Sequence, residues 1–87
     1  MTQLKIKNLK NTYKKNSIYI FKFKNLSILG SYIKHSNDIY YFEISDTSYE
    51  TLLDIKVIPK DYKINIIKTG GNSPDLKESI LFKNFIF

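Results

Sequence analysis

SIYIFKFK, residues 17–24, is the clearest strand signal in this chain. Successive side chains of a β-strand point to opposite faces, so Tyr19, Phe21 and Phe23 share one face of this stretch. The opposite face carries two isoleucines followed by two lysines. Because the middle of the stretch is apolar on both faces, we expect a central strand of a sheet, with the three aromatic rings in the core.

Further strand signals surround this one. Residues 26–34 fill two apolar faces, and Gly30 interrupts them; a glycine inside a strand indicates a bulge, a bend or a close backbone approach. The Ser-Asn-Asp composition of residues 36–38 predicts a tight turn before a strand over 39–45. Residues 62–66 alternate polar and apolar, as in a strand with one solvated face.

Three other segments have weaker signals. Residues 4–9 fit both a strand and the face of a helix, and we favour the strand. Residues 49–53 predict a short helical turn, and residues 55–58 an extended segment that runs up to Pro59. The Thr-Gly-Gly-Asn composition of residues 69–72 indicates a hairpin or loop.

The C-terminal segment carries signals for the start of a helix. Ser73 is a good N-cap residue, Pro74 suits the first helical position, and the acids at positions 75 and 78 suit the positive end of a helix dipole. These signals predict a helix over 74–84. The alternative is that the apolar residues from position 80 onward pair as a terminal strand.

Together these segments predict one domain, residues 1–87, of the mainly β class. We expect a small antiparallel barrel or curved sheet of four to six strands, of the size of SH3, Sm and OB domains, with a short C-terminal helix. Six of the last eight residues are apolar. Because chain ends fray unless they are docked, we expect this segment to close the protein's own core; the alternative is a homo-oligomer formed through the apolar C-terminus.

The charge of the chain is strongly uneven. Residues 1–37 contain eight lysines and no acid, whereas residues 38–87 contain six lysines and eight acids, giving +8 against −2. Such asymmetry indicates binding to nucleic acid or another anionic surface; the alternative is a solvated basic half with no dedicated partner. All 14 basic residues are lysine, and lysine lacks the fork with which arginine reads guanine, so base-specific recognition is disfavoured.

The residue usage also points to a source and a compartment. The 14 Lys, 14 Ile and 8 Asn, with no Arg and no Ala, indicate an A/T-rich genome, such as that of a low-GC bacterium, its phage or a mobile element. No apolar run exceeds four residues, so we expect neither a signal peptide nor a membrane span. We therefore expect a protein of the cytoplasm, bacterial or of an infected host, with no membrane partner.

Several classes of chemistry are disfavoured by what the sequence lacks. The chain has no Cys and one His, which excludes disulfides, thiolate chemistry and His-rich metal centres. Gly70 and Gly71 are followed by Asn-Ser-Pro, which is not a phosphate-binding loop. We therefore expect no enzyme, no metal and no small-molecule cofactor. One catalytic alternative is a magnesium-dependent nuclease built on Asp46, Glu50 and Asp54, which are spaced i, i+4, i+8.

Aromatic residues interleaved with lysines form the strongest functional pattern. Single-stranded nucleic acid is held by flat rings that stack on bases and by ammonium groups along the backbone. A tyrosine tolerates partial exposure better than a phenylalanine, so three tyrosines are the expected platforms. We read the one histidine, His35, as an ordinary loop residue. The predicted nucleic-acid-binding residues are Lys5, Lys7, Lys10, Tyr13, Lys14, Lys15, Lys22, Lys24, Tyr32, Lys34 and Tyr40.

These features predict a small, non-catalytic, basic binding module. Its expected partner is single-stranded nucleic acid or RNA, bound through a face rich in Lys and Tyr whose affinity falls steeply with salt. The alternative is an inhibitor protein of a phage or mobile element that blocks a host protein, for example a defence nuclease complex, by surface binding. Both predictions depend on whether the lysines of the first 37 residues gather on one side of the folded chain.

Overall fold

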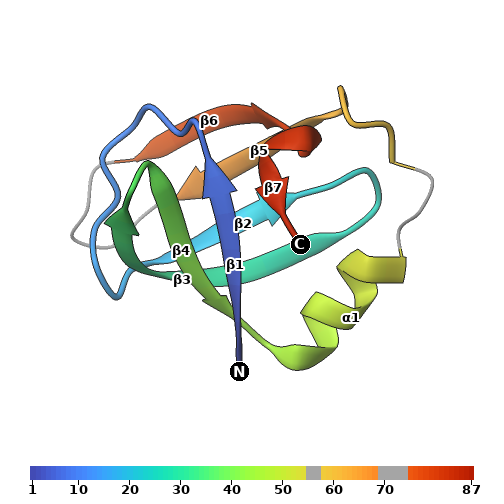
Figure 1. The fold of residues 1–87 in the computed structure, drawn as a ribbon, viewed down its shortest axis with the longest axis horizontal. Helices are drawn as coiled ribbons and strands as arrows, with labels where there is room; N and C mark the ends of the chain where they lie inside the picture. The colour runs from blue at the N-terminus through green and yellow to red at the C-terminus, as the bar shows by residue number, and fades with distance from the viewer. Residues whose placement is uncertain (55–57, 69–74) are drawn as a thin grey trace.

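The computed structural model describes residues 1–54, 58–68 and 75–87. Its seven strands form one antiparallel sheet that curls into a half-barrel, in the order β6-β5-β2-β3-β4-β1-β7, with one α-helix at one end (Figure 1). The mainly β class is therefore confirmed. The elements are β1 Thr2–Lys7, β2 Ile18–Lys22, β3 Ser27–Ser36, β4 Ile39–Ile44, α1 Asp46–Asp54, β5 Lys63–Lys68, β6 Leu76–Leu81, the 3-10 helix η1 Phe82–Asn84 and β7 Phe85–Ile86.

β2 is a central strand, as its sequence predicts. It pairs with β3 on one side and with β5 on the other. Tyr19 and Phe21 are buried inside the curl, and Phe23 is buried just after the strand ends. On the outer face Ile18 is exposed and Ile20 is half-buried, so the apolar outer face is only partly covered.

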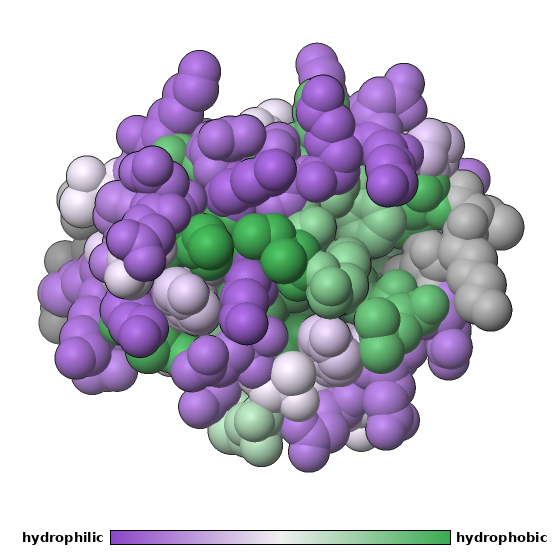
Figure 2. All heavy atoms as spheres, in the orientation of Figure 1, coloured by the Kyte–Doolittle hydropathy of each residue, from purple (hydrophilic) through white to green (hydrophobic). Residues whose placement is uncertain are grey.

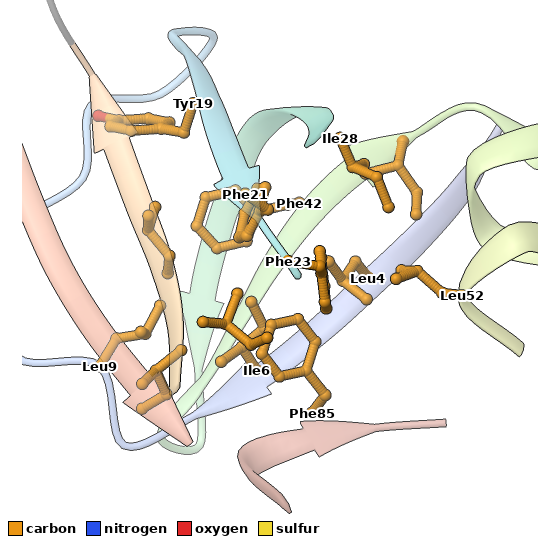
Figure 3. Close-up of a cluster of buried hydrophobic side chains, with 14 of the residues drawn as sticks. Leu4, Ile6, Leu9, Tyr19, Phe21, Phe23, Ile28, Phe42, Leu52 and Phe85 are labelled. Atoms are coloured by element: carbon orange, nitrogen blue, oxygen red, sulfur yellow. The ribbon is translucent and has the colours of Figure 1, made fainter. Parts of the chain in front are cut away.

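The core fills the inside of the curled sheet. Figure 3 shows side chains from several strands pointing toward one another there, including Phe21 and Phe42, with Leu52 reaching in from α1. Phe42 is fully buried, and four aromatic rings surround it at centroid distances between 4.9 and 6.0 Å. All four contacts are edge-to-face, the geometry that aromatic quadrupoles favour.

Gly30 lies where β3 passes close to the ring of Phe21. It pairs with Tyr19, and a Cβ atom on Gly30 would lie 2.7 Å from Cε1 of Phe21. Of the three roles that a strand glycine can have, close approach is thus the one it fulfils. The bulge of β3 lies further along, where the register with β4 shifts between Tyr32 and Lys34.

The predicted tight turn joins β3 to β4. Asn37 and Asp38 have φ angles of 53° and 64°, and the strands pair up to Ser36 and Ile39. Two successive residues with positive φ are typical of a type I′ turn, whose twist matches that of a hairpin. Asn and Asp are the residues that tolerate this conformation best after glycine.

The helix predicted over 74–84 is wrong. From position 75 onward the described chain forms β6, η1 and β7, and the sheet accordingly has seven strands instead of four to six. Pairing with β5 along all six residues of β6 outweighs the local helix signals. The α-helix of the described residues, α1, lies in mid-chain and contains the helical turn predicted for residues 49–53. The predictions for residues 55–57 and 69–74 lie outside the described residues.

The apolar C-terminus docks on the protein's own core, as predicted. β7 pairs with β1, and Phe85 is buried against Phe23 and Phe82 at centroid distances of 5.7 and 5.6 Å. Ile86 and Phe87 stay partly exposed, and the hydrophobic band in Figure 2 crosses the face that carries β7 and the C-terminus. Among the described residues there is no helix with the length and apolarity needed to cross a bilayer.

Candidate functional site

The eight lysines of residues 1–37 are all exposed. None of them forms an ion pair with a carboxylate in the part of the chain that the structure describes. They do not gather on a single face, however. One set lies on the outer face of β1 and β3, a second in the loop between β1 and β2, and a third near the far end of β2.

The first set surrounds the ring of Tyr41. Lys5 and Lys7 alternate with buried residues of β1 and therefore point outward. Lys5 is directly opposite Tyr41 in the β1–β4 register, and Lys34 is opposite Tyr41 in the β3–β4 register. The Nζ atom of Lys34 lies 5.0 Å from the centroid of the Tyr41 ring, a cation–π distance. The partly buried Tyr41 thus has a lysine opposite it on each neighbouring strand, and the ammonium group of Lys34 lies against its ring.

The second set lies in the loop of residues 8–17, beside the same end of the sheet. The backbone N–H of Asn16 donates to the carbonyl of Tyr32 at 2.9 Å, which holds this loop against β3 and places Lys14 and Lys15 near its bulge. Lys10 lines a hollow of about 520 Å³ together with His35 and Tyr40. We call Lys5, Lys7, Lys10 and Lys34, with Tyr41, His35 and Tyr40, the basic end of the molecule.

The third set lies away from the basic end. Lys22 is on the outer face of β2, opposite Ser27 and Asn65. Lys24 lies in the turn between β2 and β3, which the hydrogen bond from Phe23 N–H to the Leu26 carbonyl closes at 2.8 Å. This turn follows β2, whereas the loop of residues 8–17 precedes it, so the two lysine-bearing loops are at opposite ends of the same strand.

Two of the three predicted tyrosine platforms belong to the core. Tyr13 and Tyr32 are only 6% and 9% exposed and pack against each other and against Phe42. A stacking platform needs an open ring face, so the prediction that Tyr13 and Tyr32 stack on bases is corrected. Tyr40 is half-buried. The alternation of β4 places Tyr41 on the face opposite to Phe42, and this signal could have identified Tyr41 from the sequence.

Acidic residues gather at the other end of β1. Asp46 begins α1 and accepts a hydrogen bond from Thr2 Oγ1 at 2.7 Å. This hydrogen bond, and the nearby positive N-terminus of Met1, lower the pKa of Asp46 below its ordinary value. Glu50 and Asp54 follow on the same helix and are exposed. Figure 1 shows α1 and the loop of residues 8–17 at opposite ends of the half-barrel, so the acids of α1 lie away from Lys10, Lys14 and Lys15.

Glu78 anchors the loop of the basic end. It lies on β6, is 8% exposed, and accepts hydrogen bonds from Lys10 N at 2.6 Å, Asn11 N at 3.3 Å, Asn11 Nδ2 at 3.0 Å and Tyr13 Oη at 2.6 Å. β6 is one edge of the sheet, and β1, from which the loop starts, is next to the other edge. Glu78 therefore ties the two sides of the half-barrel together and fixes the backbone at Lys10.

The partner of Glu78 deepest in the core is Tyr13. Burial, and then the hydrogen bond to Glu78 and the negative charge of that group, raise the pKa of Tyr13 far above its ordinary value of 10.0. The phenol of residue 13 thus stays protonated in the folded protein at a pH where a solvated tyrosine ionises. Its O–H remains a donor to the carboxylate.

Replacing Tyr13 with Phe is expected to lower the free energy of unfolding by about 1.5 kcal/mol at pH 8, because the buried carboxylate loses one donor. Tyrosine in the unfolded chain ionises first, so wild-type stability falls as the pH rises above about 10. The phenylalanine variant lacks that ionisation at position 13, and the stability gap should narrow above pH 10. Urea unfolding between pH 8 and 11 measures the difference in free energy of unfolding between wild type and the variant. A difference that stays constant over this pH range contradicts the prediction.

The three acids of the nuclease alternative lie along α1. Within residues 1–54, 58–68 and 75–87 there is no group of three or more His, Asp or Glu side chains arranged to hold a metal ion. Comparison of this chain with protein-family models, with curated proteins and with solved structures finds no match. Its function has to be inferred from its own residues and their arrangement.

Proposed function

We propose that this protein is a small, non-catalytic module that holds single-stranded nucleic acid across its basic end. The observation that carries the proposal is that Lys5 and Lys34 lie on either side of Tyr41 in the register of the sheet, with Lys7 on the same outer face as Lys5. Lys10 lines the hollow that His35 and Tyr40 also line. All four ammonium groups are exposed, and none forms an ion pair in the described part of the chain. They are therefore available to a polyanion.

The arrangement suits single strands better than a duplex read by sequence. Lys5 and Lys7 are two residues apart on one strand face, so their Cα atoms are about 7 Å apart. Side chains with this spacing can follow a flexible phosphate backbone, and the ring of Tyr41, opposite Lys5 on the same face, adds an aromatic surface for a base. Lysine holds phosphate as a point charge without the bidentate geometry that selects guanine. Binding should therefore be tolerant of sequence.

The test is fluorescence anisotropy with a labelled dT 12-mer and a labelled U 12-mer at several salt concentrations. We expect wild type to bind at 50 mM salt and to weaken steeply as salt rises. The triple variant Lys5→Ala, Lys7→Ala, Lys34→Ala should bind at least about 10-fold more weakly at 50 mM salt. Three lost phosphate contacts should also reduce the slope of log affinity against log salt by about 2.

A matched control removes three exposed lysines that lie outside the basic end, Lys24→Ala, Lys60→Ala, Lys83→Ala. Both variants lose three positive charges, so a difference between their affinities depends on where the lysines lie and not on net charge. We expect the control to lose less than about 3-fold in affinity. Equal losses in the two variants would contradict the site, and absence of wild-type binding at 50 mM salt, or binding that ignores salt, would contradict the function.

A second candidate function, blocking a host protein, is supported by a different surface. On the outer face of the sheet Ile20 pairs with both Leu29 and Ile67, and Ile18 lies two residues before it. Leu29 and Ile18 are 61% and 57% exposed, and exposed apolar patches mark protein interfaces. One stoichiometric host protein retained after nuclease treatment by wild type, and lost with Leu29→Ser, would favour this function.

A further inference from the structure

A hollow opens at the basic end, between the loop that follows β1 and the turn that joins β3 to β4. Its volume is about 520 Å³, within the range of pockets that hold small molecules. The residues that line it are Asn8, Leu9, Lys10, His35, Asp38 and Tyr40. The hydrogen bond from Lys10 N–H to Glu78, and that from Asn8 Nδ2 to Asn84 Oδ1 at 2.9 Å, fix one side of it in place.

A stacked pair of rings lines this hollow. The rings of His35 and Tyr40 have centroids 4.2 Å apart and are inclined by 10°, so they lie face to face. Tyr40 is held from inside by Tyr13, whose ring meets it edge-on at 5.8 Å. His35 is exposed and has no second ring neighbour among the described residues. The stack is therefore anchored to the core at Tyr40 and open to solvent at His35.

We propose that this hollow receives one unstacked base of a bound single strand, which stacks on His35 and extends the His35–Tyr40 stack. The inference rests on the proposed function and specifies its base-binding position. Stacking on a ring is tolerant of base identity because every base has a π-face. Lys10 also lines the hollow, and its exposed side chain can reach the adjoining phosphate. The carboxylate of Asp38 accepts hydrogen bonds only, which suits a base N–H and not a phosphate.

The experiment compares two probes with equal numbers of phosphates, a labelled dT 12-mer and a labelled 12-mer of abasic residues. His35→Ala should weaken binding of the dT probe by about 5- to 50-fold, since stacking of one base on a protein ring has effects of this size. Binding of the abasic probe should change by less than 2-fold. The lysine triple variant should weaken both probes, because it acts on phosphates.

A second variant, His35→Trp, provides a direct signal. The chain contains no tryptophan, so fluorescence excited at 295 nm reports position 35 alone. We expect this variant to bind the dT probe at least as tightly as wild type, because indole offers a larger stacking face, and its fluorescence to be quenched by the dT probe but not by the abasic one. Circular dichroism of both variants confirms that the fold is retained.

The outcomes separate the two proposals. If His35→Ala leaves dT affinity unchanged, or weakens both probes equally, the base site is wrong while the lysine interface stands. If dT leaves the fluorescence of the His35→Trp variant unchanged although the probe binds, the base site is wrong as well. If wild type binds neither probe, the proposed function fails first, and the base site fails with it.

Discussion

Replacing Glu78 with Ala is expected to lower the free energy of unfolding by about 4 kcal/mol, because it removes a buried acceptor that serves several donors at once. The phenol of Tyr13 would be left in the core without a partner, and the backbone N–H groups of Lys10 and Asn11 would lose theirs. An unsatisfied buried donor costs its full desolvation energy. Urea unfolding followed by far-UV circular dichroism measures the change.

Two companion variants test the cause. Glu78→Gln keeps the size of the side chain but turns one acceptor oxygen into a donor, so we expect a loss of about 2 kcal/mol. Glu50→Ala removes an exposed glutamate of α1 and should change stability by less than about 0.5 kcal/mol. If Glu78→Ala is as stable as Glu50→Ala, the anchoring role of Glu78 is refuted. Should Glu78→Ala fail to fold, the test uses the change in free energy of unfolding of Glu78→Gln instead.

Glu78 also links stability to binding. Its bond to Lys10 N–H positions the loop beside the hollow at the basic end. Loosening of this loop should therefore weaken oligonucleotide binding in Glu78→Gln, even under conditions where the variant stays folded. The lost carboxylate would by charge alone favour a polyanion. A weaker affinity would thus report the position of the loop and not the change in net charge.

Replacing Gly30 with Ala is expected to lower the free energy of unfolding by about 3 kcal/mol, because a densely packed core can accommodate an extra carbon only by shifting side chains or backbone. The new Cβ would lie 2.7 Å from Cε1 of Phe21 and 3.3 Å from Cγ2 of Ile44. Both neighbours are fully buried, so neither side chain can swing into solvent. Either the strands must separate locally or the ring of Phe21 must leave its packing against Phe42.

A double-mutant cycle assigns the cost to this contact. Phe21→Leu removes the ring atom that clashes, so the pair Gly30→Ala with Phe21→Leu should be more stable than the sum of the single changes predicts, by at least about 1 kcal/mol. Ser31→Thr adds a carbon to the next residue of β3, which is only partly buried, and should shift stability by less than about 0.5 kcal/mol. A coupling energy of zero between Gly30→Ala and Phe21→Leu would exclude the clash as the cause of the loss.

The candidate site could be read from the sequence only in part. Alternation along residues 2–7 indicates that Lys5 and Lys7 share a face, but the neighbours of that face depend on the registers of β1 and β3 with β4. These registers place Tyr41 between Lys5 and Lys34, residues that are 29 positions apart in the chain. His35 lies beside a turn in the sequence, and only its pairing opposite Tyr40 makes it part of a stack.

Local patterns were sufficient for the strands of residues 17–45 and for the Asn37-Asp38 turn, because alternation and turn chemistry act between residues that are close in the chain. They failed for the C-terminal segment. Read locally, the acids at positions 75 and 78 suit the start of a helix. In the structure, however, Glu78 is buried in a strand, and its hydrogen-bond donors come from residues 65 to 68 positions away in the chain. Contacts of that separation form only when the sheet curls, and their energy outweighs local propensity. The same closure buries Tyr13 and Tyr32 and divides the lysines among three places, so which charges meet was settled by packing and not by their order in the chain.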